Sequence, residues 1–452
     1  MLRIPALALL ACTVLPAQQP PMPTQLPGSP FFIKQTWVIG GVGNWDYLTM
    51  DPAASRLYIA HGPVVQVVDV ETGQLTGTVT GLREAHSVAL DDTGEFGYVT
   101  DGPASQVKVF DRRTLAVVGT ISTGPAPRAL VFEPRNQLLF AVCAMSAPPA
   151  QPAAAQGGRA PNAPRPASGN APPRSPASEE VKSSVTVIDA QTRQPLGEIL
   201  MPGRLGFAET DSNGQVFINM VNRNWIVRLD AESIASLLGR RAGRAAAAQT
   251  TAPQPASTPP SPAPTNQAQA QPSPAPSTPP TAGSTSQVLD WSHESRLPNS
   301  AENRMNLLSV GPECRELSAL AIDGPHERLF AACANMRLLV LNGATGEQVA
   351  SLPIGPGPEA IGYDSGRGLI YSANGGAQGS LTIIRQDVTD SYAVIQNLPT
   401  RQRARTLAVN PATGNVYLVT DLLGFRLDRP GGIGTLQTPP LPGSFQVLVV
   451  GN

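Results

Sequence analysis

The sequence predicts an all-β fold, a seven-bladed β-propeller built of four-stranded blades. Three observations support this prediction. A short unit recurs seven times, most copies are spaced by about 40 to 46 residues, and the strands alternate apolar and polar residues with a period of two. Such a unit leaves apolar faces open on its own, so neighbouring units must cover one another in a ring.

Each unit has an apolar strand that ends in an acidic residue or Asn, then a turn, then a second strand that begins near an aromatic residue. The strand-ending positions are Asp51, Asp91, Glu133, Asp211, Asp323, Asp364 and Asn410. The aromatic positions are Tyr58, Tyr98, Phe140, Phe217, Phe330, Tyr371 and Tyr417. A third strand and a fourth follow in most units, separated by a polar turn, which completes a four-stranded blade.

The ring needs a closing strand. Residues 32–39 form a strand that precedes the first unit and belongs to no unit. The last unit has a closing strand at Phe445–Val450 but lacks a fourth one. We therefore expect the N-terminal strand to lie outermost in the last blade, beside Phe445–Val450, where it covers an otherwise open edge.

The N-terminus predicts export. Residues 1–17 are typical of a signal peptide, because the apolar run Ile4–Leu15 is too short for a membrane-spanning helix. Residues 18–30 are then a linker and residues 31–452 the propeller. An alternative is a lipid anchor at Cys12, since Leu9-Leu10-Ala11-Cys12 resembles a lipobox. Both predict a periplasmic or secreted protein, and no transmembrane span is expected.

Two insertions lengthen the third and fourth units. Residues 147–178 are rich in Ala and Pro, and residues 231–300 hold a short helix followed by a Pro/Ser/Thr-rich tract at Thr250–Gln287. Both compositions offer little to bury, so disorder is expected in the two tracts. Arg240, Arg241 and Arg244 near the helix fit a solvated surface better than a nucleic-acid patch.

Charge and cysteine content narrow the function. The chain has 32 Lys and Arg against 33 Asp and Glu, a net charge of -1, which argues against a dedicated nucleic-acid or membrane-surface protein.

Cys314 and Cys333 flank an expected antiparallel hairpin. In an oxidising compartment this proximity predicts a disulfide between them, and Cys143 has no partner in its own unit.

The repeat register predicts a polar rim at one mouth of the channel. It combines positions five residues before the acidic residue with positions three residues after the aromatic one. The charged or polar candidates are Asp46, His61, His86, Asp101, Arg128, Glu359, Asn374 and Arg405. Arginine in a concave polar surface suits an anionic ligand, so the rim is a candidate site for a small polar or anionic ligand, a glycan or a protein.

Signals for catalysis are weak. The sequence has no supported nucleophile motif, and His61, His86 and Asp46 lack the spacing that fixes metal ligands on one element, so we predict no catalytic residue, no metal and no cofactor. The alternative is a metal-dependent lactonase or hydrolase using Asp46, Asp101, Glu359 and Asn374. Arg128 and Arg405 would compete for those ligands.

The repeats GYVTD, VKVFDRRTLAVVGTI and VTVIDAQT resemble the YncE-like family of YVTN-repeat β-propeller proteins. The resemblance covers residues 32–450 apart from the two tracts. The fourth unit departs from it, because RLGFAETD lacks the usual Pro-Glu before its strand. The family implies an exported bacterial propeller without catalytic activity, used for binding or scaffolding. Some relatives are associated with DNA, so nucleic-acid binding is a further alternative.

Overall fold

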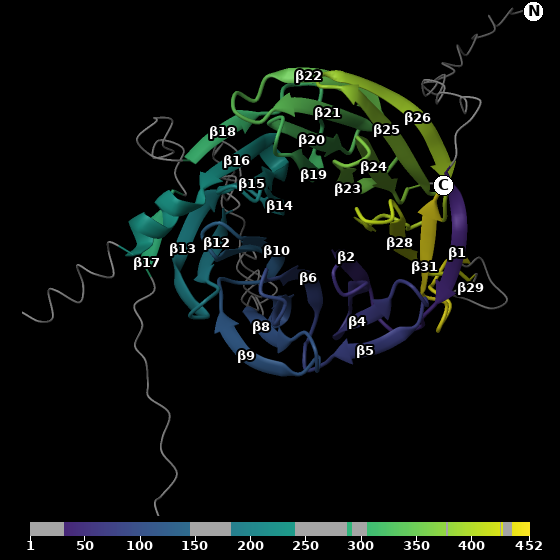
Figure 1. Ribbon diagram of the computed structural model, residues 1–452, viewed down its shortest axis with the longest axis horizontal. Helices are drawn as coiled ribbons and strands as arrows, with labels where there is room; N and C mark the ends of the chain where they lie inside the picture. The colour runs from purple at the N-terminus through teal and green to yellow at the C-terminus, as the bar shows by residue number, and fades with distance from the viewer. Residues whose placement is uncertain are drawn as a thin grey trace, which may run out of the picture.

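The chain forms a propeller of seven sheets around a central channel (Figure 1). The computed structural model describes residues 31–144, 182–239, 287–291, 305–376, 378–424, 426–427 and 436–452. In these residues each of seven sheets contributes four antiparallel strands, and one sheet carries a fifth strand at its outer edge. The all-β, seven-bladed fold that the repeats predict is confirmed.

The first three blades each begin at the channel and run outward, one strand after another. Blade 1 contains β2 (Trp45–Asp51), β3 (Arg56–His61), β4 (Val64–Asp69) and β5 (Leu75–Val79). Blade 2 contains β6 (Ala85–Leu90), β7 (Phe96–Asp101), β8 (Gln106–Asp111) and β9 (Val117–Ser122). Blade 3 contains β10 (Pro127–Glu133), β11 (Leu138–Ala144), β12 (Lys182–Asp189) and β13 (Gln194–Pro202).

The next three blades repeat this order. Blade 4 contains β14 (Leu205–Thr210), β15 (Gln215–Met220), β16 (Trp225–Asp230) and β18 (Met305–Ser309). Blade 5 contains β19 (Leu317–Asp323), β20 (Arg328–Cys333), β21 (Arg337–Asn342) and β22 (Gln348–Pro353). Blade 6 contains β23 (Pro358–Asp364), β24 (Leu369–Asn374), β25 (Ser380–Val388) and β26 (Ser391–Pro399). Single 3-10 turns, Gly102–Ala104 and Val221–Arg223, follow β7 and β15.

Blade 7 closes the ring with both ends of the propeller. It contains β27 (Leu407–Val409), β28 (Val416–Thr420), β31 (Gln446–Gly451) and, outermost, β1 (Phe32–Val38). A small hairpin of β29 (Arg426–Leu427) and β30 (Leu436–Gln437) lies in the connection before β31. The predicted place of the N-terminal strand is confirmed, since β1 is antiparallel to β31.

In six of the seven blades, the recurring acidic residue or Asn accepts a hydrogen bond from a backbone N–H group in the turn that follows the innermost strand. Glu133 accepts hydrogen bonds from the backbone N–H groups of Arg135 and Asn136, at 3.0 and 2.8 Å. Asp211 does the same for Asn213 at 2.8 Å. A tight turn exposes N–H groups that no strand partner can take, and a short acidic side chain accepts them locally. The repeat motif is therefore a turn requirement.

The recurring aromatic residue fills the boundary between two blades. In the described part of the chain the core divides into seven hydrophobic clusters. Each joins residues of neighbouring blades around one aromatic; Tyr58 of blade 1, for example, packs with Val88 and Phe110 of blade 2. All seven aromatics are buried. The core is thus a ring of interfaces, and no blade is buried without its neighbours.

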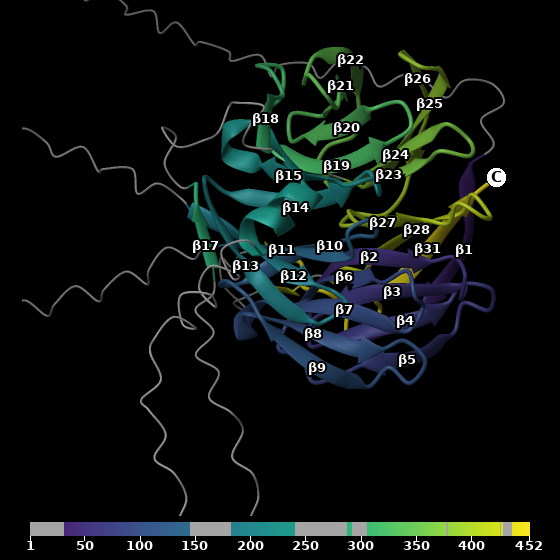
Figure 2. The same cartoon turned by 60° about the vertical axis from the view of Figure 1, so that its left-hand side comes forward.

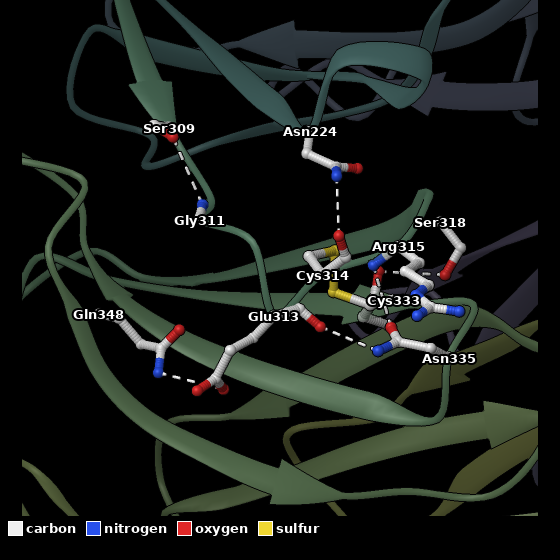
Figure 3. The surroundings of a disulfide bond; sticks show 11 residues. Asn224, Ser309, Gly311, Glu313, Cys314, Arg315, Ser318, Cys333, Asn335 and Gln348 are labelled. Carbon is white, nitrogen blue, oxygen red and sulfur yellow. Dashed lines mark hydrogen bonds between the residues drawn. A yellow bond between two sulfur atoms is a disulfide. The ribbon is translucent and has the colours of Figure 1, made fainter.

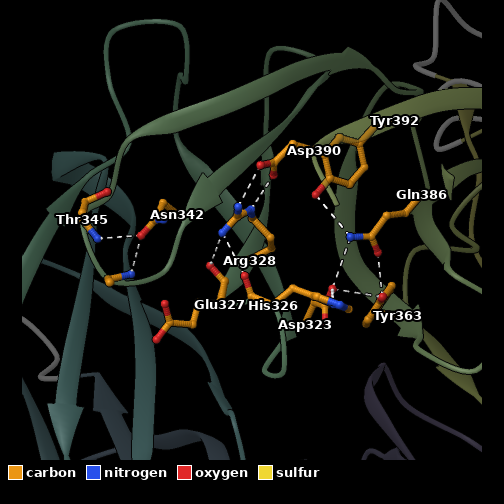
Figure 4. Close-up of polar contacts among 11 residues, drawn as sticks. Asp323, His326, Glu327, Arg328, Asn342, Thr345, Tyr363, Gln386, Asp390 and Tyr392 are labelled. Carbon is orange, nitrogen blue, oxygen red and sulfur yellow. Dashed lines mark hydrogen bonds and ion pairs between the residues drawn. The ribbon is translucent and has the colours of Figure 1, made fainter. Parts of the chain in front are cut away.

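Polar contacts add to the boundary between blades 5 and 6 (Figure 4). Both Arg328 nitrogens Nε and Nη2 donate to Asp390, at 2.6 and 2.9 Å. Deeper in the same boundary, Asp323 accepts from the Tyr363 hydroxyl at 3.2 Å and from Gln386 at 3.3 Å. The end of β19 is tied to the neighbouring blade by side chains, beyond the apolar contact.

A disulfide joins Cys314, in the loop before β19, to Cys333 at the end of β20 (Figure 3). The two Cα atoms are 5.3 Å apart, as the hairpin brings them together. The Cys314 carbonyl also accepts a hydrogen bond from the Asn224 amide of blade 4, at 2.7 Å. This crosslink therefore fixes the entry into blade 5. Cys143 is buried as a free thiol.

Blade 3 carries an addition that the repeat pattern does not predict. β17 (Gln287–Asp290) pairs in parallel with β13 and makes a fifth, outer strand (Figure 2). Residues 231–239 are helical, as expected, and Leu238 of this helix shares a core cluster with Leu289 of β17. The predicted insertion 231–300 thus contains an element that covers the edge of a neighbouring blade.

Several predictions concern residues outside the described ranges. They are the signal peptide and linker at residues 1–30, with the alternative lipid anchor at Cys12, the insertion 147–178, the arginines 240, 241 and 244, and the tract 250–286.

Candidate functional site: a charged rim at the channel mouth

The first residues of the innermost strands form a charged rim at one mouth of the channel. Asp46, His86, Arg128 and Arg405 line one polar cavity of about 280 Å³, together with Glu84. They come from blades 1, 2, 3 and 7, which the ring brings together. Glu359 of blade 6 joins the group through Arg405. Five of the eight predicted rim residues are therefore neighbours.

Two contacts between side chains hold this rim in place. Nδ1 of the buried His86 lies 2.9 Å from the Asp46 carboxylate, across the boundary of blades 1 and 2. Nε of Arg405 lies 3.1 Å from Glu359, and its Nη2 donates to the Trp45 carbonyl at 3.1 Å. Arg405 thereby connects blades 6, 7 and 1. Both carboxylates already have a nitrogen partner within 3.1 Å.

Arg128 differs from Arg405, the other arginine of the rim. It is exposed on β10, and within the described residues its guanidinium has no hydrogen-bond or ion-pair partner. Guanidinium presents several N–H donors in a planar fork that matches carboxylate and phosphate oxygens. The rim can therefore offer an anion one unengaged guanidinium beside a fixed one.

A tryptophan beneath the rim was not among the predicted residues. Trp45 is 2% exposed, and two guanidinium groups lie near its indole ring, Arg403 at 4.6 Å and Arg405 at 5.5 Å from the centroid. Nη1 of Arg403 also lies 3.0 and 2.9 Å from the two carboxylate oxygens of Asp421. The ring supports the rim from below and holds Arg405 by cation–π attraction. Its position directly before Asp46 is the only sequence signal for this role.

Three of the eight predicted residues lie away from the rim, buried in the loop framework. His61 is 2% exposed; its Nδ1 lies 2.7 Å from the Gln66 amide oxygen and its ring lies 3.9 Å from that of Phe445. Asp101 accepts backbone hydrogen bonds from Arg83 and Glu84, at 3.0 and 3.1 Å.

Asn374 is the third. It is fully buried, and its amide nitrogen donates to the Ser380 and Thr382 hydroxyls at 3.3 and 3.0 Å. These three residues end the second strand of their blades, one strand away from the channel, where inter-strand loops cover them. Buried polar groups need hydrogen-bond partners, and these side chains form hydrogen bonds with loop backbone groups and with neighbouring side chains. The rim in the structure therefore contains fewer residues than the register predicts.

The rim does not assemble a metal site. Across the described ranges, no three His, Cys, Asp or Glu side chains lie together as metal ligands would. The four residues considered for a lactonase-type site are divided, since Asp46 and Glu359 lie at the rim whereas Asp101 and Asn374 are buried in loops. Among the described residues, no helix is long and apolar enough to cross a bilayer.

Comparison with known proteins supports the fold. A scan against protein-family models finds no match, and a search of curated proteins finds none. Solved structures do match. The structure of U3-55K superposes with a TM-score of 0.55 at 7% identity, over 91% of this chain and 97% of that one. The RRP9 WD40 repeats give 0.54 at 7% identity, over 91% and 96%.

A bacterial structure also matches, the hydrazine synthase of Kuenenia stuttgartiensis, with a TM-score of 0.53 at 14% identity, over 86% of this chain and 95% of that one. At such identities the likeness shows the fold alone. The protein is a seven-bladed β-propeller with WD40-like structural neighbours.

Proposed function

We propose that the protein is an exported, non-catalytic binding propeller that holds an anionic ligand at its charged rim. A propeller with WD40-like neighbours fits a binding or scaffolding role in general. One observation carries the finer proposal: the exposed Arg128 shares a polar cavity with Arg405 and His86 and has no partner within the described residues. An anion there gains charge-assisted hydrogen bonds without breaking an existing ion pair.

Two further observations support export and the ligand class. A disulfide between buried cysteines suits an oxidising compartment, as does the leader that the sequence predicts at residues 1–17. The repeats resemble the YncE-like family, which implies an exported bacterial protein. The ligand's anionic group is either free, as in a small carboxylate or phosphate, or carried by a glycan or a partner protein.

Calorimetry with inorganic phosphate and with succinate tests the site. Arg128→Ala should abolish binding of the anion that the unaltered protein binds, with the melting temperature unchanged, because an exposed and unpaired charge contributes little to folding. Arg337→Ala is the matched control, since Arg337 is exposed on β21 outside the rim. Equal binding by the Arg128 variant would place the anion elsewhere. Turnover of a lactone that depends on Asp46 would decide for the metal-dependent hydrolase.

A further inference from the structure

The channel interior is a second cavity, separate from the rim. It has a volume of about 460 Å³ and is lined by the innermost strands of blades 1, 2, 3, 4, 6 and 7. None of its lining residues belongs to the rim cavity. The volume is in the range of small-ligand sites, roughly 300–1,000 Å³. The interior therefore has room for a ligand of its own.

An aromatic pair spans the channel at the rim side of this cavity. Tyr47 on β2 and Phe207 on β14 have ring centroids 5.0 Å apart, with their planes tilted by 59°. β2 and β14 lie on opposite sides of the ring (Figure 1). Each residue stands one position after the rim position of its blade, so the two rings lie between the rim and the interior. They give the interior cavity an aromatic wall.

Glu209 is the charged residue of the interior. Among the residues described as lining the cavity, it is the single Asp, Glu, Lys, Arg or His. It follows Phe207 by two residues on β14, so the two side chains are about 7 Å apart along one face of the strand. The equivalent position in the other lining blades carries a small or uncharged residue: Thr49, Ala89, Val131, Gly362 and Ala408.

No described residue provides a counter-ion for the Glu209 carboxylate. Within the described part of the chain it has no ion-pair partner, and its one hydrogen bond is with the backbone of Thr210. Burial raises the pKa of Glu209 to about 7, because desolvation disfavours its charged form. The residue is still partly exposed, so solvent reaches it. A positively charged ligand would pair with this carboxylate, for which the described residues supply no cation.

We propose that this cavity binds a small organic ammonium ion, with Glu209 as counter-ion and the Tyr47 and Phe207 rings as its cation–π surface. Divalent metals fit the cavity less well. Calcium takes six to eight oxygen ligands and magnesium needs octahedral geometry, whereas the interior offers one carboxylate. One carboxylate beside aromatic faces is instead the arrangement that recognises alkylammonium groups.

Isothermal titration calorimetry with choline tests this site. The unaltered protein should bind choline, and it should ignore the neutral analogue in which a tert-butyl group replaces the trimethylammonium group. Glu209→Gln should weaken choline binding by about tenfold or more, since the attraction of a partly buried counter-ion is lost. Phe207→Leu should weaken it by about three- to thirtyfold, the loss of one cation–π contact.

Three controls make the test decisive. Glu209→Asp keeps the charge and should recover part of the affinity, whereas Glu347→Gln removes an exposed carboxylate on blade 5 and should change nothing. Near pH 7, choline binding should release protons, because it favours ionised Glu209; titrations in two buffers of different ionisation enthalpy measure this. Absence of choline binding, equal binding of the neutral analogue, unchanged affinity in a folded Glu209→Gln variant, or binding of calcium chloride in place of choline would overturn the proposal. None of these results depends on anion binding at the rim.

Discussion

Phe32 in β1 pairs with Gly451 in β31, so the first and the last strands of the propeller lie side by side in one blade. Aromatic side chains in and beside β1 also pack against other strands. Phe31 packs against Tyr371, with ring centroids 6.0 Å apart, and Trp37 packs against Tyr417 at 5.8 Å. β1 is thus the strand that closes the ring, and Phe31 directly before it extends the contacts to blade 6.

A chain that begins at residue 40 should be severely destabilised. It loses β1, exposes the edge of β31 and uncovers apolar surface, at about 1.5–3 kcal/mol for each large side chain. Thermal melting followed by circular dichroism measures the effect. A chain that begins at residue 31 is the control, because it keeps every described strand. Identical melting of the two chains would show that β1 does not close the ring.

The closure and the blade count could be predicted from the sequence because both are repeat properties. The acidic turn residue and the aromatic recur in register, which gives the number of blades. The N-terminal strand belongs to no unit and the last unit lacks one strand, so the sequence pairs the two. β17 could not be predicted in this way. It has four residues, Gln287–Asp290, which follow a Pro-rich tract and pair in parallel outside the repeat scheme.

The rim was predictable only in part. The repeat register identifies equivalent positions, among them Asp46, His86 and Arg128, which line one cavity. The register does not show which of these positions loops cover, so it predicts Asp101 and Asn374 at the rim although both are buried. The repeat register also does not predict contacts across the ring, because these depend on how far side chains extend from opposite blades.

The Cys314–Cys333 disulfide should contribute on the order of 3 kcal/mol to the free energy of unfolding, given the loop of about 20 residues that it closes. The double variant Cys314→Ser with Cys333→Ser should therefore unfold at lower urea concentration than the oxidised protein. A reductant should lower the midpoint of the unaltered protein and leave that of the double variant where it is. A midpoint in the parent that does not respond to reductant would contradict the prediction.

Glu209 should make stability depend on pH in a defined direction. Its folded pKa of about 7 lies above the unfolded value, so the folded state holds a proton that the unfolded chain releases. The contribution of protonated Glu209 to the free energy of unfolding is fully present below about pH 4.5 and is lost as the pH rises through 7. Relative to Glu209→Gln, the unaltered protein should lose stability across this interval. If the melting temperatures of the two proteins changed by the same amount between pH 4.5 and 8, the prediction would be contradicted.

Tyr47 and Phe207 should be energetically coupled despite lying in opposite blades. A double-mutant cycle with Tyr47→Ala and Phe207→Ala should give a coupling energy of about 0.5–1.5 kcal/mol in urea unfolding, the value of an aromatic pair beyond its buried area. The combination of Tyr47→Ala with Tyr392→Ala serves as control, since Tyr392 contacts Phe330 in a different part of the ring. Strict additivity in the first cycle would mean that the rings do not touch in solution.

The pairing of β1 with β31 also determines how the molecule yields to mechanical force. The two strands are antiparallel, and the start of β1 at Phe32 lies opposite the end of β31 at Gly451. A pull on the two chain ends therefore loads the hydrogen bonds one pair after another, from Phe32–Gly451 towards Val38–Gln446, instead of shearing them together. We therefore expect β1 to separate before the other strands of blade 7, which opens the ring at this blade.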